Sequence, residues 1–195
     1  MKNRSNVFLV LSGPSGVGKT TVAKKFVTYH KEFKISISTT TRPKRVSEKN
    51  GIDYYFIDKE QFKQEIANDY FLEYEHVHGY YYGTSKSSVD ELLKQGKSII
   101  FDIDVKGAMK IKQKFPDTIM IFIKPPSMDE LRLRLSKRAS ESKDDIKKRL
   151  RRLEFEYDYG KNFTYIIIND SLAQTIEEIR KIVANHKEKP LRGYN

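Results

Sequence analysis

Apolar and polar positions along this chain fall into short blocks whose period changes, and the first blocks predict a strand followed by a helix. Residues 7–11 form a continuous apolar run, which is typical of a strand buried on both faces. Residues 21–30 instead have helical spacing, with Val22, Phe26 and Val27 on one face. A strand that leads directly into a helix indicates the start of an α/β unit.

The same alternation continues to the end of the chain. Asp58-x-x-Gln61 and Ser127-x-x-Glu130 resemble capping boxes and mark two helix starts. Further strands are expected at residues 35–38, 54–57, 71–77, 98–103, 118–123 and 165–168. Further helices are expected at residues 58–68, 85–95, 105–115, 127–138, 144–159 and 172–185, with a frayed tail at 186–195.

Strands that alternate with helices predict a parallel α/β sheet flanked by helices. The 195 residues fit one domain with a sizeable core. Residues 39–53 form a long polar and basic loop, and long loops in compact domains are usually functional. No internal repeat is visible.

Composition narrows the class of protein. There is no cysteine, which excludes disulfides, thiolate zinc sites and cysteine nucleophiles and fits a reducing cytoplasm. The basic start and the apolar run after it superficially imitate a signal peptide, but five residues are too few for its apolar region. No segment reaches the roughly 20 apolar residues of a membrane span. We therefore expect a cytoplasmic protein with no membrane partner.

The formal net charge of +11 requires an anionic partner or a largely solvated basic surface. Nucleic acid is one candidate, because lysines and arginines that neutralise phosphates dominate such binding. The basic residues are spread along the whole chain, however, which favours a pocket for phosphorylated small molecules together with ordinary solvated faces. We expect no nucleic-acid partner.

Residues 13–20 read Gly-Pro-Ser-Gly-Val-Gly-Lys-Thr, a complete phosphate-binding loop between the first strand and helix. Glycines let successive backbone N–H groups point at phosphate oxygens, and the helix N-terminus favours the anion. Lys19 adds a cation for the terminal phosphates, and the Thr20 hydroxyl can bind Mg²⁺. A glycine-rich turn without a ligand is the alternative, and the flanking strand and helix argue against it. The motif predicts binding of a nucleoside triphosphate.

Asp102 and Asp104 lie at the carboxyl end of an apolar strand, two residues apart and thus on one face. Carboxylates at such a place are costly unless a cation or donor meets them, and ligands bind at this edge of open sheets. A Mg²⁺ site beside the phosphate-binding loop is the natural partner. The alternative, that Asp104 or Asp102 only caps the next helix, stays open.

Several basic and aromatic clusters could hold anions. Arg134 and Arg138 are one helical turn apart and repel one another unless phosphate lies between them. Arg149 could approach from a second helix, although a solvated basic face is the ordinary reading. Further candidates are Arg42 and Arg45 around Pro43, and the aromatic, turn-like segment 79–84. His76 and His78 share a strand face, but no further His or Cys nearby supports zinc.

These motifs occur together in the order of one family. The phosphate-binding loop is followed by Ser-Thr-Thr-Thr-Arg-Pro-Lys-Arg at 38–45, Gly-Tyr-Tyr-Tyr-Gly-Thr at 79–84, Phe-Asp-Ile-Asp at 101–104 and Arg-x-x-x-Arg at 134–138. From about residue 7 to 182 the chain resembles guanylate kinase, which transfers the γ-phosphoryl of ATP to GMP and gives ADP and GDP. The resemblance implies one P-loop kinase domain over 1–195, a small mixed α/β GMP-binding insert at 39–83 and a helical lid at 127–164.

The resemblance also implies roles for individual residues. It implies Mg²⁺-dependent, direct in-line transfer, with the metal at Thr20 and Asp102, as an essential step of guanine nucleotide metabolism and GMP recycling. The catalytic cations would be Lys19, Arg42, Arg134, Arg138 and Arg149. ATP would be bound by Gly13, Pro14, Ser15, Gly16, Val17, Gly18, Lys19, Thr20 and Asn169. GMP would be bound by Ser38, Arg42, Arg45, Glu48, Tyr54, Glu73, Tyr82, Thr84 and Asp104.

Two positions depart from the family pattern. Ser47 stands where the family usually has glycine, and Ala139 follows Arg138 where glycine is usual. The first change could stiffen the substrate loop and the second the lid hinge. Neither removes a functional side chain, so they bear on rates and not on the reaction.

The chemistry agrees with this resemblance, because phosphoryl transfer requires alignment and neutralisation of charge more than a protein nucleophile. Guanine offers two donors on one edge, which a carboxylate such as Glu73 with a hydroxyl such as Thr84 complements. Rival readings are a non-catalytic peptide-binding module of the same fold, a kinase for AMP or UMP/CMP, and a nucleic-acid-dependent ATPase. The intact Lys19, Thr20 and Asp102 argue against the module. We expect ATP and GMP, and also dGMP, as substrates of a monomer or weak homo-oligomer.

Overall fold

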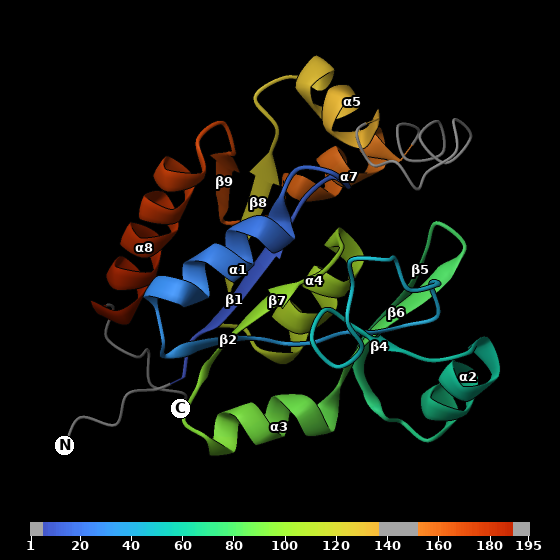
Figure 1. Cartoon of the computed structure of the whole chain (residues 1–195). Coiled ribbons are helices and arrows are strands. Elements are labelled where there is room, and N and C mark those ends of the chain that lie inside the picture. Colours follow the sequence, from blue (N-terminus) through green and yellow to red (C-terminus); the bar gives the residue numbers. More distant parts are fainter. Residues whose placement is uncertain (1–5, 137–151, 189–195) are drawn as a thin grey trace.

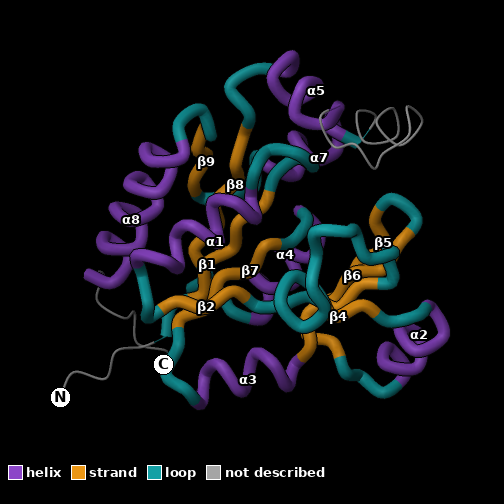
Figure 2. The backbone as a smooth tube through the Cα atoms, in the orientation of Figure 1, coloured by secondary structure: helices purple, strands orange, loops and turns teal. Residues whose placement is uncertain are grey.

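A five-stranded sheet forms the centre of the computed structural model, which describes residues 6–136 and 152–188 (Figure 1). Every neighbouring pair of strands is parallel, which confirms the expected fold class. Figure 2 shows the strands side by side with helices around them. In spatial order the strands are β2 (Phe33–Ile35), β7 (Ser98–Asp102), β1 (Phe8–Ser12), β8 (Ile119–Lys124) and β9 (Tyr165–Ile168).

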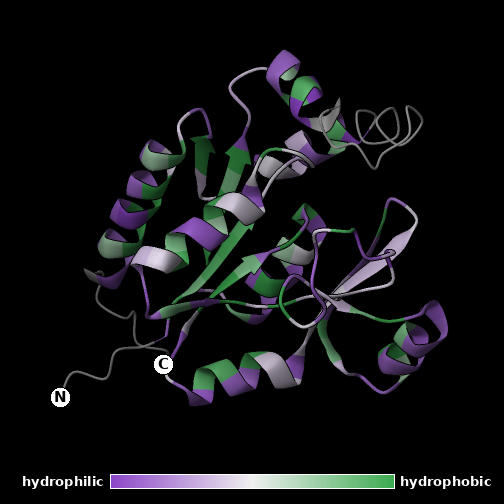
Figure 3. Cartoon of the chain, viewed as in Figure 1, coloured by the Kyte–Doolittle hydropathy of each residue, from purple (hydrophilic) through white to green (hydrophobic). Residues whose placement is uncertain are grey.

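Helices cover both faces of this sheet, because successive strand residues point to opposite sides. Leu9 and Leu11 pack with α1 and α8, whereas Val10 between them packs with α3 and α4. Figure 3 shows the central strands as the hydrophobic part of the fold. The helix bounds are α1 Lys19–Tyr29, α3 Lys86–Lys94, α4 Val105–Lys114 and α8 Leu172–Glu188.

A second, four-stranded sheet lies between β2 and α3 in the sequence. Its β5 and β6 form an antiparallel hairpin, while β3 pairs antiparallel with β6 and parallel with β4. Phe62 of α2 stacks on Phe71 and Tyr81, with ring centroids 4.4 and 5.2 Å apart. The bounds are β3 Thr39–Thr40, β4 Tyr55–Phe56, α2 Lys59–Ala67, β5 Phe71–Val77 and β6 Tyr80–Ser85.

Two further helices, α5 (Met128–Ser136) and α7 (Leu153–Gly160), lie beside the end of β8 (Figure 1). Leu131 and Leu153 pack together with Tyr157 in a small cluster of their own. The start of α5 follows the expected capping pattern, since the Ser127 hydroxyl accepts the Glu130 amide at 3.1 Å. In the same way Asp58 accepts the Gln61 amide at 2.7 Å and starts α2.

The segment 79–84 was expected to be turn-like, but residues 80–84 in fact belong to strand β6. Only His78 and Gly79 form the turn, and both have positive φ angles, 53° and 88°. Such a two-residue turn matches the twist of a hairpin, so the tyrosines after it pair directly with β5. The prediction was wrong because the flanking glycines were taken as turn residues, although Gly83 sits inside the strand.

The second strand was expected at residues 35–38, but β2 ends at Ile35. The Ser36 amide still donates to Ile100, at 2.9 Å, whereas the Ser38 carbonyl accepts from Tyr55 of the other sheet, also at 2.9 Å. The chain therefore leaves the central sheet between these two serines. This transition places Ser38 between the two sheets.

Two helix ends also differ from expectation. The described part of the expected helix 144–159 is α7, and residues 144–151 lie outside the described residues, as do 137–143. The last helix continues to Glu188, so residues 186–188 of the expected frayed tail are helical. Among the described helices, none combines the length and the apolar character that crossing a membrane requires.

The packing of α1 on the sheet yields a first prediction. Phe26 is fully buried and lies against the rings of His30 and Phe33, so Phe26→Ala leaves a cavity in the core. We expect the free energy of unfolding to fall by about 3–5 kcal/mol in urea denaturation. Tyr29→Ala, on the exposed face of the same helix, is the control and should change it by less than about 0.5 kcal/mol. A loss below about 1 kcal/mol at Phe26 would contradict this packing.

Candidate active site

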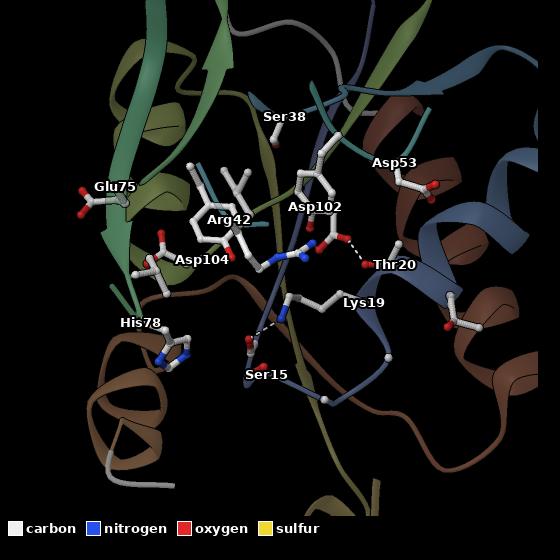
Figure 4. Close-up of a pocket in the computed structure, with 18 of the residues that line it drawn as sticks. Ser15, Lys19, Thr20, Ser38, Arg42, Asp53, Glu75, His78, Asp102 and Asp104 are labelled. Atoms are coloured by element: carbon white, nitrogen blue, oxygen red, sulfur yellow. Dashed lines mark hydrogen bonds between the residues drawn. The ribbon is translucent and has the colours of Figure 1, made fainter. Parts of the chain in front are cut away.

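The phosphate-binding loop joins β1 to α1, and its glycines adopt the backbone that the motif requires. Gly13, Gly16 and Gly18 all have positive φ angles, 142°, 89° and 99°. A Cβ at Gly13 would lie 2.2 Å from the Ile123 carbonyl oxygen of β8, so the loop lies tightly against the sheet. The Lys19 ammonium donates to the Gly13 and Pro14 carbonyls at 2.7 and 3.1 Å, which places this cation over the loop (Figure 4).

A hydroxyl and a carboxylate meet beside this loop. Thr20 at the start of α1 donates to Asp102 at the end of β7, with Oγ1 and Oδ2 2.5 Å apart. Both are hard oxygen ligands of the kind that Mg²⁺ prefers. The described residues contain no cluster of three or more His, Cys, Asp or Glu side chains suited to a metal. Such a pair fits a magnesium ion whose other ligands are water and phosphate oxygens, the usual arrangement with nucleotides.

The loop between β3 and β4 contributes two arginines that one carboxylate holds in place. Arg42 donates to Glu48 at 2.7 Å, and the Arg45 amide donates to the other Glu48 oxygen at 2.9 Å. Burial opposes ionisation of Glu48, but these hydrogen bonds outweigh it and hold its pKa below the ordinary value. The Arg42 guanidinium also lies 5.4 Å from the centre of the Tyr54 ring. Glu48 thus positions the two cations.

Two tyrosines border the same arginines. Tyr54 and Tyr82 meet edge to face, with ring centroids 6.1 Å apart. Burial, followed by the charge of Asp102, raises the pKa of Tyr54 well above its ordinary value. Its hydroxyl therefore stays protonated and can donate a hydrogen bond. Together the arginines and tyrosines form a group of donors suited to a phosphate.

On the opposite wall, a carboxylate is almost completely buried. Glu73 of β5 faces Thr84 of β6 across the hairpin, and the Thr84 hydroxyl donates to Glu73 Oε1 at 2.6 Å. Only 5% of Glu73 is exposed. Burial raises its pKa to about 7, and Asp104 adds to the rise, whereas the Thr84 hydrogen bond lowers it. The cavity wall therefore presents a carboxyl group whose protonation state depends strongly on the ligand beside it.

One cavity connects all of these groups. It is lined by the phosphate-binding loop, by α1, by the carboxyl end of β7 and by the second sheet with its loop before β4. Lys19 and Arg42 extend toward its middle from different elements (Figure 4). Two cations that share a space favour an anion between them. The other wall carries the carboxylates of Glu73, Glu75 and Asp104, so the cavity suits a ligand with phosphate at one end and hydrogen-bond donors at the other.

Comparison with known proteins agrees with this geometry. A family model for guanylate kinase matches residues 5–186. The chain belongs to the guanylate kinase family. The guanylate kinase of Clostridium perfringens (strain SM101) is 44% identical over 186 residues, which are 95% of this chain and 86% of that protein. That of Caldanaerobacter subterraneus subsp. tengcongensis is 42% identical over 184 residues, 94% of this chain and 89% of that protein.

The fold agrees as well. The crystal structure of guanylate kinase from Anaplasma phagocytophilum superposes with a TM-score of 0.80 and 32% sequence identity. The match covers 97% of this chain and 90% of that one. Members of this family are ATP:GMP phosphotransferases, that is, nucleoside monophosphate kinases.

Most of the residues named by the guanylate kinase resemblance line this cavity. Of the nucleotide-loop residues, Pro14 and Val17 do not, and Thr84 lies fully buried behind Glu73. Arg138 and Arg149 lie outside the described residues. The cavity-lining residues of the resemblance are Gly13, Ser15, Gly16, Gly18, Lys19, Thr20, Ser38, Arg42, Arg45, Glu48, Tyr54, Glu73, Tyr82, Asp102 and Asp104.

Asn169 and Arg134 lie on the far side of the phosphate-binding loop. The Asn169 amide donates to the Val17 carbonyl at 2.8 Å, and its oxygen accepts from Thr175 at 3.1 Å. Arg134 approaches the Val17 and Asn169 carbonyls at 3.4–3.5 Å and pairs with Glu130 at 2.8 Å. In this structure both side chains support the loop backbone from behind.

Asp104 has a double role that the sequence left open. One of its oxygens accepts the Gly107 amide at 2.9 Å, so Asp104 caps α4, although capping is not its only contact. The other accepts from Arg152 at 2.5 Å, and both side chains remain mostly buried. Asp104 lines the cavity at the same time.

Sequence reasoning missed several ion pairs around the cavity, of which two show the reason. Arg152 at the start of α7 reaches Asp104, and Lys24 of α1 pairs with Asp53 of the long polar loop. Asp53 also accepts the Lys49 amide at 2.8 Å. The partners are 48 and 29 residues apart in the sequence, so no local spacing could have indicated either pair.

The buried Glu73 predicts a pH-dependent cost to stability. Its pKa is about 7 in the folded protein against an ordinary 4.5, so the unfolded chain ionises first and the wild type loses stability as pH rises between these values. Glu73→Gln cannot ionise but can still accept from Thr84. We expect the stability of the variant relative to the wild type to increase by about 2–3 kcal/mol from pH 5 to pH 8.

Urea denaturation of both proteins at several pH values measures this difference. Glu178→Gln, on the exposed face of α8, serves as the matched control and should follow the wild type. A difference between Glu73→Gln and wild type that stays constant from pH 5 to pH 8 would refute the raised pKa.

Proposed function

We propose that this protein transfers the γ-phosphoryl of ATP to GMP and releases ADP and GDP. The observation that carries the proposal is the single cavity that joins a phosphate-binding loop to a buried carboxylate across a pair of arginines. The loop would take the phosphates of ATP, and the second sheet would take the whole of GMP. The membership of the guanylate kinase family supports the same reaction.

At the ATP end, backbone N–H groups of residues 13–20 would hold the phosphates, and Lys19 would neutralise the terminal ones. Thr20 and Asp102 would hold a magnesium ion, which when bound neutralises charge on the phosphate oxygens. Arg134 lies behind the loop, and Arg138 is four residues further along the sequence. We propose that both turn toward the transferring phosphoryl group. Arg149 would join them from the undescribed segment.

At the GMP end, Arg42, Arg45, Tyr54 and Tyr82 would hold the phosphate. Glu48 would act through the two arginines, because its oxygens already accept from both residues. The buried carboxylate of Glu73 would accept from the two donors on the guanine edge, with Ser38 and Asp104 nearby and Thr84 behind it. The 2′-hydroxyl plays no part in these contacts, so dGMP is a second expected acceptor.

Base selection follows from the same carboxylate. Adenine lacks the paired donor edge of guanine and would leave the buried Glu73 carboxylate with no partner besides Thr84, and an unsatisfied buried acceptor is costly. Sites that hydrogen-bond a substrate edge reject analogues that lack it by about 10³-fold or more. The site therefore distinguishes GMP from AMP by charge and hydrogen bonding and not by shape alone.

We further propose that residues 39–83 and 127–164 move as two units over the bound nucleotides. Closure would bring the cations together and exclude water, which otherwise competes as phosphoryl acceptor. The transfer itself would proceed directly between the two nucleotides, since alignment and neutralised charge suffice. We propose a cytoplasmic enzyme that acts as a monomer or weak homo-oligomer.

One assay tests the proposed function and separates it from its rivals. ADP formation is followed with ATP plus GMP, dGMP, AMP, CMP or UMP as acceptor. We expect GMP to exceed AMP in kcat/KM by at least about 10³-fold, with dGMP also accepted. Phosphorylation of AMP or a pyrimidine nucleotide in preference to GMP, or no transfer at all, would overturn the proposal.

Lys19→Ala tests the phosphate end of the same reaction. Removing a cation that stabilises the transferring group should lower kcat/KM by about 10²–10⁴-fold. The fold should persist, because the side chain lies over the loop and outside the hydrophobic clusters. Lys25→Ala, on the exposed side of the same helix, is the control and should retain activity. A well-folded Lys19→Ala protein with near-normal turnover would refute the role of this lysine.

A further inference from the structure

The first turn of α4 passes unusually close to the buried carboxylate at Gly107. A Cβ atom at this position would lie 2.6 Å from Glu73 Oε2 and 3.2 Å from Glu73 Cδ. It would also lie 3.3 Å from Asp104 Oδ1. A carbon and an oxygen without a bond between them do not approach to the first of these distances, so any side chain here must displace Glu73.

The helix itself does not require a glycine at this place. Gly107 lies inside α4 and has no positive φ angle that would favour glycine. Its amide donates to Asp104 at 2.9 Å, which an alanine amide could do equally well. Within a helix, alanine is more favourable than glycine by about 1 kcal/mol. Local stability therefore favours the residue that the site excludes.

Glu73 has little freedom to move aside without losing its orientation. Thr84 holds one oxygen at 2.6 Å, and Glu73 is buried between β5 and α4. A methyl group at residue 107 would push the other oxygen and turn the carboxylate about the first. Elsewhere glycines make similar room for core rings, since Cβ atoms at Gly83 and Gly160 would meet Phe71 and Phe122 at 2.7 and 2.8 Å. At Gly107 the group that needs the room belongs to the cavity wall.

We propose that Gly107 is a specificity-determining residue, whose missing side chain lets the Glu73 carboxylate face the base of the acceptor nucleotide beside Asp104. The proposal rests on the proposed function, because it assigns the guanine edge to this carboxylate. Gly107 acts through Glu73 and is a positioning residue that touches no substrate. A substitution of Gly107 should therefore affect base recognition more than fold stability, and the two effects can be measured separately.

The test compares Gly107→Ala with Gln113→Ala. The second variant introduces alanine on the exposed side of the same helix. Calorimetric titration measures the Kd for GMP and, separately, for ATP without metal, and thermal unfolding measures Tm. We expect Gly107→Ala to weaken GMP binding by about 10- to 100-fold, which corresponds to about 1.4–2.7 kcal/mol. ATP binding should change by less than about twofold, and Gln113→Ala should bind like the wild type. The Tm of Gly107→Ala should shift by no more than about 5 °C, because the helical preference for alanine opposes the cost of displacing Glu73.

Equal GMP binding by Gly107→Ala and wild type would overturn the inference. So would a fall in Tm together with equal weakening of GMP and ATP, because that pattern indicates general damage. If the wild type binds no GMP, the proposed function fails and the inference with it. If the wild type binds GMP and Gly107→Ala binds it equally tightly, the inference alone fails.

A second background shows whether Gly107 acts through Glu73. Glu73→Asp shortens the side chain by one methylene and withdraws the carboxylate from residue 107, so the added methyl group no longer meets it. In this background Gly107→Ala should weaken GMP binding by less than about threefold, a non-additive result expected of residues in contact. The same 10- to 100-fold loss in both backgrounds would contradict the proposal.

Discussion

The burial of one carboxylate, Glu73, in the wall of the cavity constrains much of the surrounding structure. An acidic side chain in this position is costly, and the cost raises its pKa to about 7. The Thr84 hydroxyl donates a short hydrogen bond to one Glu73 oxygen, and Gly107 leaves room for the other. Asp104, its charged neighbour, is in turn held by Arg152 and the start of α4. A ligand that offers two hydrogen-bond donors relieves this cost, and one that offers none leaves it in place.

The central sheet provides the fixed frame for the opposite end of the cavity. Strands β1, β7 and β8 run parallel, so the loop after β1 and the Asp102 carboxylate at the end of β7 meet at one edge of the sheet. Gly13 lies so close to β8 that no side chain fits between this end of the loop and the sheet. The second sheet is joined to this frame by Lys24 and Asp53 across the cavity. The phosphate-binding loop and the second sheet thus face each other across the cavity, as the proposed transfer between two nucleotides requires.

Much of this could be predicted from the sequence, because local patterns determine local structure. The phosphate-binding loop, the strands 71–77 and 165–168 and the caps of α2 and α5 all follow from short-range rules. Segment 79–84 was misread, since its strand character depends on pairing with β5 and not on its own residues. The partnership of Arg152 with Asp104 and the closeness of Gly107 to Glu73 are tertiary contacts between distant segments. No spacing in the sequence encodes them.

The pKa of Glu73, measured with and without GMP, most directly tests whether this buried carboxylate recognises the base. Carbon-detected NMR follows the side-chain carboxyl through a pH titration, with Glu73→Gln used to assign the signal. The account predicts a midpoint near pH 7 in the free protein. It also predicts a fall to below about 5 with GMP bound, because donors on the base favour the charged form. An ordinary midpoint near 4.5 in the free protein, or a midpoint that GMP leaves unchanged, would contradict this expectation.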